Sequence, residues 1–429
     1  MKFSKKFFFN IHSWIGIRLS ILFFIVCFSG TLATLSHEMD WLFNPEMRAT
    51  PKKELASRNL IVSNFKKLYP NAKVQLWMRP NEPYLCDILY KIENENLSYV
   101  FANRYTGKIQ GESALTVQRF FRDLHYYLFI PFQIGNFVVL FFGFMLLISL
   151  ITAICFYKKW WHKLFELQTG KGALVFFRSI HRLVGLWSIP FCLLFSITGI
   201  WYFIERANVA GIGEQVNPRP PQLSDTEETE LSVNLTYAID YDKAVLIAQK
   251  EIPGLVAGNM YVPQKATDVL GVIGKSNVPL VRQRANRVLI NPRTNTVVSS
   301  QKASEISTAM WINDSVDPLH FGYWGGLLTK CIWFIFGCGI SSLVLSGIWI
   351  TCKRKSIKRK KNNQPIMGQW RFINWGLFGV LMSCMYWALL TKYHVSFSAI
   401  IYISLGWSIF IFLSWYIFEY RLKKAVYKA

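Results

Sequence analysis

The stretch His12-Ser-Trp-Ile-Gly16 opens an apolar run that closes at Ser29-Gly30, and the chain contains this stretch twice. The second copy is His181-Arg-Leu-Val-Gly185, whose run closes at Thr198-Gly199. In both copies the first Gly comes four residues after the His and the last Gly eighteen residues after it. This spacing indicates an internal duplication in which each copy begins with a histidine.

A second pair of histidines follows the same rule. Leu124-His125 and Leu319-His320 each precede an apolar run, and the basic segment that follows each run begins at Lys158 or Lys353, thirty-three residues after the His. The order in each half is therefore His, apolar helix, polar domain, Leu-His and apolar helix. Four histidines are thus placed at the ends of predicted membrane helices.

The whole chain has the composition of a membrane protein. Its 429 residues are 52% hydrophobic and 16% aromatic. A helix needs about 20 apolar residues to cross a bilayer, and six segments qualify: roughly 14–36, 132–157, 184–204, 326–352, 373–391 and 397–418. We expect a mainly α membrane protein with a duplicated four-helix transmembrane core, two extra C-terminal helices and two small α+β domains.

Short basic loops predict the orientation of these helices. Segments 158–182 and 353–361 are rich in Lys and Arg, and Lys2, Lys5 and Lys6 precede the first helix, so we expect these segments and both termini in the cytoplasm. The predicted order is helix 1 in 1–37, outward domain 1 in 38–124, helix 2 in 125–157, a loop at 158–180, helix 3 in 181–205, outward domain 2 in 206–319, helix 4 in 320–352, a basic loop at 353–371, helices 5 and 6 at 372–391 and 397–418, and a tail at 419–429.

The net charge of +23 is explained by this topology, because the basic residues lie mainly in short inner loops. It therefore predicts no nucleic-acid partner, and segment 353–361 is expected to contact anionic lipid. The basic start followed by an apolar run resembles a signal peptide, but the run is too long for one and its copy begins at His181, so we expect helix 1 to be retained. The eight cysteines show no metal or haem-attachment spacing.

Each outward segment has the pattern of one helix on an antiparallel sheet. In the first, helical periodicity over 54–68 precedes strand-like runs at 73–78, 84–92 and 97–102. In the second, a helix at 241–251 precedes strands near 258–262, 269–273 and 287–290. Thr106-Gly107 and Thr294-Asn295 occupy matching places and predict the tight turn of a terminal hairpin. Segment 211–232, with Pro and acidic residues, is typical of a linker.

The duplication predicts how the four histidines are arranged. Both halves cross the membrane in the same direction, which gives a pseudo-twofold axis along the membrane normal. We therefore expect His12 to face His181 at the cytoplasmic end, and His125 to face His320 at the outer end. Two opposed imidazoles suit the axial positions of a haem, and bis-histidine ligation leaves iron without an open position, which favours electron transfer. Gly16, Gly30, Gly185 and Gly199 would let a flat porphyrin, or simply another helix, approach closely.

Other polar residues near these helices have less specific interpretations. His37 ends helix 1 on the outer side and is either an outer-haem or substrate contact or an interfacial residue. Arg182, and Arg119 and Arg122 beside His125, either pair with haem propionates or act as orientation charges. His162 and His394 have no partner in the repeat and are expected to be solvated. Each of the four core histidines could instead be a polar group satisfied by a neighbouring helix.

The source of electrons is constrained by motifs that the sequence lacks. No GxGxxG opens a strand–helix unit, no P-loop is present, and Gly211-Ile-Gly213 lies in the predicted linker. We therefore expect electrons to come from a membrane quinol or from a separate cytoplasmic reductase.

The chain resembles the PepSY-associated transmembrane family over about residues 5–355. The residues that carry the resemblance are His12 to Gly16, Ser29-Gly30, Tyr105-Thr-Gly-Lys108, Leu124-His125, Ile180-His-Arg-Leu-Val-Gly-Leu-Trp187, Thr198-Gly199, Leu319-His-Phe-Gly322, Gly325-Gly326 and Ser346-Gly347. The helix, the strands and the closing Tyr-Thr-Gly-Lys look like a PepSY domain. The resemblance implies an inner-membrane protein of Gram-negative bacteria linked to iron acquisition, similar to haem-bearing ferric-siderophore reductases.

With these features, the resemblance implies a ferric-siderophore reductase of the oxidoreductase class. It would hold two b-type haems, one ligated by His12 and His181 and the other by His125 and His320, and reduce a ferric siderophore bound near the outward domains. Two other functions fit the same chain. The outward domains would restrain a periplasmic peptidase while haem-free helices anchor them, or the helices would form a small-solute transporter, although none of the six carries a central Asp or Glu.

Overall fold

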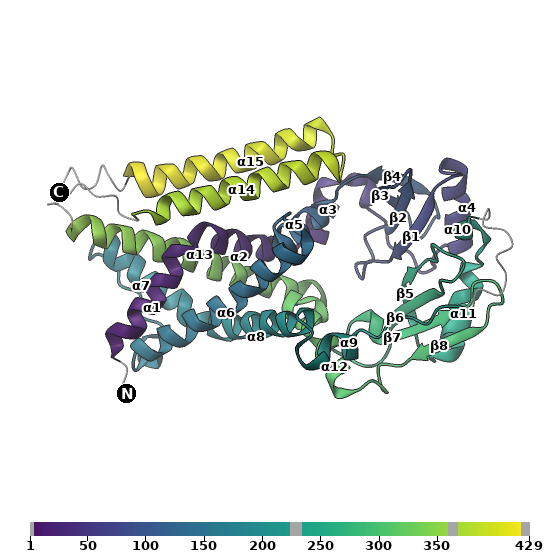
Figure 1. Ribbon diagram of the computed structural model, residues 1–429, viewed down its shortest axis with the longest axis horizontal. Helices are drawn as coiled ribbons and strands as arrows, with labels where there is room; N and C mark the ends of the chain where they lie inside the picture. Colours follow the sequence, from purple (N-terminus) through teal and green to yellow (C-terminus); the bar gives the residue numbers. More distant parts are fainter. Residues whose placement is uncertain (1–3, 224–233, 359–367, 422–429) are drawn as a thin grey trace. The chain divides into compact units, whose positions relative to one another are not determined.

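A computed structural model describes residues 4–223, 234–358 and 368–421 of the chain. These residues form two compact units (Figure 1). The membrane unit comprises Met1–Leu35, Phe121–Phe203 and Gly325–Ala429, and the sheet unit comprises Ser36–Phe120 and Ile204–Trp324. The middle of the predicted basic loop at 353–371, most of the tail at 419–429 and the acidic end of the predicted linker lie outside the described residues.

The membrane unit is built from long apolar helices. They are α1 (Lys5–Arg18), α2 (Ser20–Thr34), α6 (Phe132–Phe156), α7 (Ala173–Trp187), α8 (Ile189–Arg206), α13 (Gly326–Lys358), α14 (Trp370–Thr391) and α15 (Phe397–Trp415), with α5 (Val117–Tyr127) leading into α6. Five of the described helices are long and apolar enough to span a bilayer alone, and α1 with α2 forms a sixth candidate span. The expectation of a multi-pass membrane protein is confirmed.

The first span is broken, although an unbroken helix over 14–36 was expected. The α-helix stops at Leu19, whose φ of −113° and ψ of 35° lie outside the helical region, and α2 continues at 77° to α1. The second copy breaks at the matching position, because Ser188 separates α7 from α8. Each break comes seven residues after the histidine that opens its copy. The duplication therefore extends to the interruption of the helix.

The predicted segments 125–157 and 320–352 placed His125 and His320 at the start of membrane spans. In the structure both histidines precede the spans. His125 lies in the last turn of α5, and His320 in the last turn of α12 (Thr308–Phe321). Leu128 and Phe129 after α5 have φ of 57° and 55°, and Gly322 after α12 has φ of 71°. These left-handed residues end each helix before the span begins, as is common at helix C-termini.

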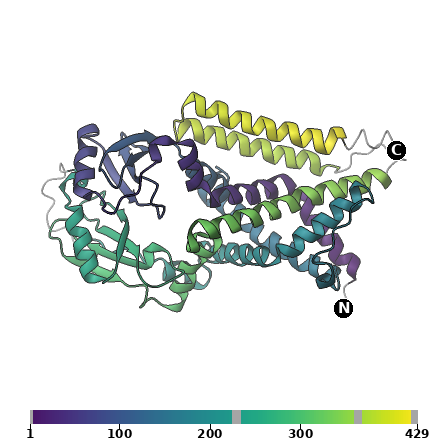
Figure 2. The ribbon, with the colours of Figure 1, turned by 180° about the vertical axis from the view of Figure 1, so that it is seen from behind.

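Small residues let the spans pack closely. A Cβ placed on Gly143 of α6 would lie 3.4 Å from the backbone of Gly199 on α8, and one on Gly337 of α13 would lie 2.6 Å from the hydroxyl of Thr31 on α2. Such crossings are typical of membrane helices, where small side chains allow backbones to approach. In addition, α1 packs on α6 and α7 packs on α13. The hairpin of α14 and α15 lies along this core, with α14 in contact with α2 (Figures 1 and 2).

The sheet unit contains one antiparallel sheet of eight strands, in the order β4-β3-β2-β1-β5-β6-β7-β8. The strands are β1 (Lys73–Met78), β2 (Asp87–Glu93), β3 (Asn96–Ala102), β4 (Ile109–Ser113), β5 (Val256–Tyr261), β6 (Leu270–Lys275), β7 (Asn286–Ile290) and β8 (Val297–Gln301). Its helices are α3 (Ser36–Phe43), α4 (Arg58–Leu68), α9 (Ile212–Val216), α10 (Leu235–Ala238), α11 (Tyr241–Glu251) and α12. The predicted turns hold, since Gly107 and Asn295 have φ of 74° and 57°.

The two outward segments share this sheet instead of forming separate ones. Strand β1 of the first segment pairs with β5 of the second, with Leu76 opposite Tyr261 and Trp77 opposite Met260. One hydrophobic core is shared by both segments, with Phe65 and Trp77 from the first and Met260 from the second. Pairing covers the two edges that separate sheets would have left exposed, which explains why two similar segments join in this way.

Candidate functional site

The structure brings His12 and His181 together. His12 lies on α1 and His181 on α7, and their ring centres are 6.3 Å apart with the ring planes at 81°. Two imidazoles that ligate one metal ion from opposite sides, with metal–nitrogen bonds of about 2.0 Å, have ring centres roughly 6 Å apart. The separation of the two rings therefore fits a shared axial ligation. Helices α1 and α7, the first helices of the two copies, supply the rings as the duplication predicted.

Hydrogen bonds hold both rings by the same nitrogen. Nδ1 of His12 lies 3.0 Å from the carbonyl oxygen of Ser149 on α6. Nδ1 of His181 lies 2.8 Å from Oγ of Ser346 on α13, and this hydroxyl donates to the carbonyl of Ser342. Both partners accept, so each Nδ1 carries the proton and each Nε2 presents a lone pair. Metal-binding histidines are usually oriented by such a bond from the second ring nitrogen.

The surroundings of this pair also suit a flat ligand group. Gly347 of α13 lies beside His181, where a Cβ would come 3.4 Å from its Cε1. The ring of Phe156 lies edge-on to His12 at 5.6 Å. Among the described residues, no three His, Cys, Asp or Glu side chains are grouped so as to hold a metal ion. A porphyrin supplies four of its iron's ligands itself, so two histidines are all that the protein must add.

His125 is held against the backbone of α2. Its Nδ1 lies 2.9 Å from the carbonyl oxygen of Val26, and its ring occupies the space where a side chain on Gly30 would be. A Cβ on Gly30 would lie 2.6 Å from Cε1 of His125, too close for any real contact. Glycine at position 30 therefore opens the face of α2 through which the imidazole reaches the carbonyl one turn earlier. This explains why the first run closes on Ser29-Gly30.

His320 belongs to the sheet unit, and the pairing of His125 with His320 stays a prediction. The His320 ring lies edge-on to Phe321, with ring centres 5.2 Å apart. Because α12 ends directly after these residues, His320 stands at the end of its helix as His125 does in α5.

The other candidates from the sequence have partners elsewhere. His37 pairs with Glu82 of the sheet unit at 3.2 Å. Arg182 donates to the carbonyl of Glu166 at 2.8 Å and stacks near Tyr157, so it fastens the loop that follows α6. Arg122 lies 6.0 Å from the centre of the Tyr126 ring. The backbone N–H of Arg119 donates to Oγ1 of Thr116. His162 contacts Trp161, and His394 is exposed after α14.

The sequence reasoning missed the residues that orient the histidines. Ser149 and Ser346 are serines within long apolar spans, and a polar residue in such a span often marks a functional contact. Asn374 is another: it is the single polar member of the buried stripe Asn374, Phe378, Leu381, Met385, Ala388 and Leu389 on α14. A search for buried polar residues at helical spacing would have singled it out.

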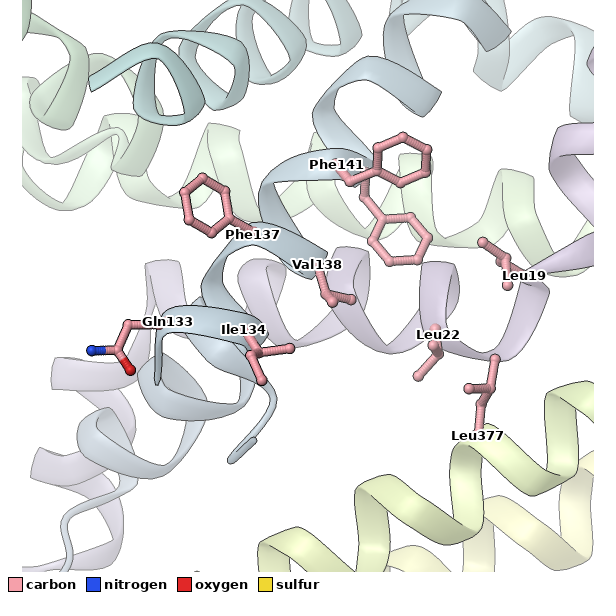
Figure 3. Close-up of a pocket in the computed structure, with 9 residues that line it drawn as sticks. Leu19, Leu22, Gln133, Ile134, Phe137, Val138, Phe141 and Leu377 are labelled. Atoms are coloured by element: carbon pink, nitrogen blue, oxygen red, sulfur yellow. The ribbon is translucent and has the colours of Figure 1, made fainter. Parts of the chain in front are cut away.

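A separate apolar hollow of about 700 Å³ lies along α2 and α6 (Figure 3). It is lined by Leu19, Leu22, Gln133, Ile134, Phe137, Val138, Phe141, Phe142 and Leu377. The Gln133 side chain extends away from the apolar group in Figure 3. None of the lining residues is titratable, so the hollow offers no group that would exchange a proton with a ligand.

Comparison with known proteins identifies the family of the chain. The sequence model of the PepSY-associated TM region matches residues 9–354. Similarity also extends to the uncharacterized protein PA4219 of Pseudomonas aeruginosa, which is 22% identical over 250 residues. That match covers 54% of this chain and 63% of the relative's length. The matched family region contains His12, His125, His181 and His320 and ends before α14. The chain belongs to the PepSY-associated transmembrane family.

Proposed function

We propose that this protein is an inner-membrane electron-transfer protein that holds two b-type haems. His12 and His181 ligate the inner haem, and His125 with His320 ligates the outer one. The observation that carries the proposal is the pair of rings 6.3 Å apart, each held by Nδ1 so that Nε2 is presented to a ligand. Bound in this way, haem iron exchanges single electrons without binding substrate. In this proposal the duplicated four-helix core carries both sites.

The broken first span shortens the path between the two haem levels. His12 lies seven residues before the break and Gly30, which supports His125, eleven residues after it. At 1.5 Å per residue and a bend of 77°, these positions are about 20 Å apart, compared with about 27 Å in a straight helix. Phe23 and Phe142 stack at 5.3 Å on α2 and α6, within this interval. The chain therefore reduces the distance that electrons must cross.

The direction of transfer follows from the expected topology. The N- and C-termini are cytoplasmic, electrons enter at the His12 level from a membrane quinol or a separate cytoplasmic reductase, and they leave at the outer level. The acceptor is a ferric siderophore held near the two PepSY-like domains in the periplasm. Hard oxygen ligands bind Fe(III) strongly, so reduction to Fe(II) loosens the complex and releases the iron. The protein would thus act as a ferric-siderophore reductase.

The test is a reduced-minus-oxidised absorption spectrum of the full chain purified in detergent. We expect a red protein with a Soret band, a sharp reduced α band and two haems per chain. A colourless protein expressed with ample haem would contradict the proposal. It would favour a PepSY anchor that regulates a peptidase, or a small-solute transporter. Transfer is then checked in liposomes in which the quinol and the ferric siderophore cannot meet. The siderophore iron should be reduced to Fe(II) only when the protein is present.

Gly30→Ala tests the outer site separately. The added methyl group would overlap the His125 ring and push it away from the carbonyl of Val26. Losing the group that orients a metal-binding histidine weakens metal-site affinity about 10–100-fold, so we expect the outer haem to be depleted and the inner one retained. Haem content and redox titration measure this. Gly406→Ala on α15, where a Cβ meets nothing within 4 Å, is the control, and equal haem content in both variants would count against the placement of His125.

A further inference from the structure

We propose that Asn374, on the first of the two C-terminal helices, is a positioning residue for His12. It fixes the broken first span in the bent form that carries His12 toward His181. The role of Asn374 in holding the bend is inferred from the geometry alone. The effect of the bend on the inner haem rests on the proposed function. The inference gives the C-terminal hairpin a role, although the hairpin lies beyond the matched family region.

A helix break inside a membrane leaves backbone groups without partners. At Leu19 the α-helical hydrogen bonds are interrupted, so the last carbonyls of α1 and the first N–H groups of α2 need other partners. Little water reaches an apolar span, so a backbone group without a protein partner there is unfavourable. A persistent bend at this place therefore requires polar side chains that bind to the exposed backbone groups.

The side chain of Asn374 binds both sides of the break. Its Nδ2 donates to the carbonyl of Arg18, the last residue of α1, at 2.8 Å, and its Oδ1 accepts from the N–H of Ile21 on α2 at 3.2 Å. Nδ2 also donates to the carbonyl of Trp370, one turn earlier on its own helix, at 2.8 Å. The residue is 2% exposed. Only a carboxamide combines two donors with an acceptor in this way, so neither Asp nor Leu would replace it.

A second contact ties α1 to the same helix. The guanidinium of Arg18 lies 4.5 Å from the centre of the Trp370 ring on α14 and 5.3 Å from that of Trp14 on α1. A cation between two indole faces is favourable, more so where water is scarce. Arg18 is six residues after His12 on the same helix. Its position between the two rings therefore restrains the arm of α1 that carries the histidine.

The second copy keeps a helical hydrogen bond at its break. The carbonyl at each break accepts from the N–H four residues later, Leu19 from Phe23 and Ser188 from Cys192, at 2.8 Å in both copies. The N–H of Ser188 also donates to the carbonyl of Val184 at 2.9 Å, so the bond to the preceding turn is kept there. The bend of 77° is found in the first copy, and this copy is the one that α14 contacts through α2. The hairpin thus compensates an asymmetry between the two halves.

The other end of α14 holds the segment that carries His125. The hydroxyls of Tyr393, just after α14, and of Tyr127 on α5 both donate to the carboxylate of Asp123, which is 1% exposed. Asn374 and Tyr393 therefore contact two histidine-bearing segments from opposite ends of one helix. Helix α14 is therefore placed to set the distance between the segments that carry His12 and His125.

The decisive variant is Asn374→Leu, which keeps the size of the side chain and removes all of its hydrogen bonds. Ser383→Ala on the same helix is the matched control, because its hydroxyl donates to Gly379 of α14. The full chain is studied in nanodiscs, with genetically encoded spin labels at Lys5 and at the exposed Ile335. Swinging the 14-residue α1 out of its 77° bend would move its start by roughly 25 Å. We expect a shift on the order of 10 Å or more with a broadened distribution in Asn374→Leu, and none in Ser383→Ala.

The haem spectrum is the second readout. In Asn374→Leu we expect the inner haem to change from low-spin to high-spin, because His12 leaves while His181 stays, and the outer haem to remain low-spin. Unchanged distances and an unchanged spectrum would overturn the inference. A wild-type chain without haem would overturn the proposed function instead, and the label distances would still decide whether Asn374 holds the bend. If Asn374→Leu does not accumulate, Arg18→Gln is measured in the same two ways. We expect a smaller change in the distance between the labels, and an unchanged distance would contradict the inference.

Discussion

His181→Ala is expected to remove one of two haems and leave the other intact, and His12→Ala is expected to remove the same one. Their rings are 6.3 Å apart and each is held by Nδ1, so both would ligate one iron through Nε2. Losing either ligand leaves iron with a single axial histidine, and the haem is retained poorly. We expect haem content to fall from two per chain to about one in each variant. The double variant should lose no more than either single variant.

The measurement combines haem content with electron paramagnetic resonance, which separates the two low-spin centres. His394→Ala is the matched control, since His394 is exposed after α14 and should leave both signals unchanged. If His12→Ala and His181→Ala removed different haems, the two rings would not share an iron, and the pairing at the inner level would be wrong. Full retention of both haems in either variant would remove that histidine from the site.

The inner pair was accessible from the sequence because the repeat is nearly exact in spacing. His12 and His181 open equivalent runs, and equivalent residues of parallel repeats face each other across the axis. The groups that orient them were not accessible. Ser149 and Ser346 do not match in the repeat, since position 149 corresponds to Val344 when His125 is aligned with His320. In each half, the group that accepts the hydrogen bond from the histidine lies at a different position on the second span. The spacing of the repeat therefore does not predict these positions.

For the strands and for the bend, too, local sequence patterns predicted the elements but not the contacts between distant segments. Strand β1 and helix α11 lie where the periodicity of 73–78 and 241–251 predicted them. The apolar pattern within each segment is enough to predict which face is buried. The pairing of β1 with β5 joins segments far apart in the chain and leaves no local pattern. The bend at Leu19 depends on Asn374, more than 350 residues away. An apolar run that reads as one helix is broken because a distant side chain supplies the missing hydrogen bonds.

Asp87→Asn is expected to destabilise the sheet unit more than any other conservative change. Asp87 is fully buried at the start of β2 and pairs with Arg79 at 2.6 Å and with Arg104 at 3.4 Å. It also accepts from the indole N–H of Trp77 at 2.8 Å. Arg58 lies over that indole and donates to the carbonyl of Gly258 in the second half of the sheet. One carboxylate therefore compensates Arg79 and Arg104 and lies next to the indole that Arg58 covers, and Arg58 joins the two halves.

Removing one partner of a buried ion pair costs about 3–5 kcal/mol, because the charge left behind has no compensation. The free energy of unfolding of the sheet unit should fall by this amount at neutral pH, measured by denaturant titration of Trp fluorescence in the full chain. Glu93→Gln is the control: the partner of Glu93, Lys91, keeps a second carboxylate in Glu112 at 2.8 Å, so no charge is left without compensation and the loss should stay below about 1 kcal/mol. A loss no larger than that of Glu93→Gln would show that Asp87 is not the centre of this network.

The effect should also depend on pH in a direction that the charges determine. Burial disfavours ionisation of Asp87, but the positive charges of Arg79, Arg58 and Arg104 outweigh it and lower the pKa of the carboxyl below its ordinary value. A lowered pKa stabilises the fold fully above the unfolded-state pKa of about 4, and this stabilisation is lost as the pH falls through the folded-state pKa. Wild type should therefore lose stability in acid more steeply than Asp87→Asn, so the difference between them narrows. A difference that stays constant from pH 7 to about pH 3 would mean that the carboxylate charge is not what stabilises this part of the sheet.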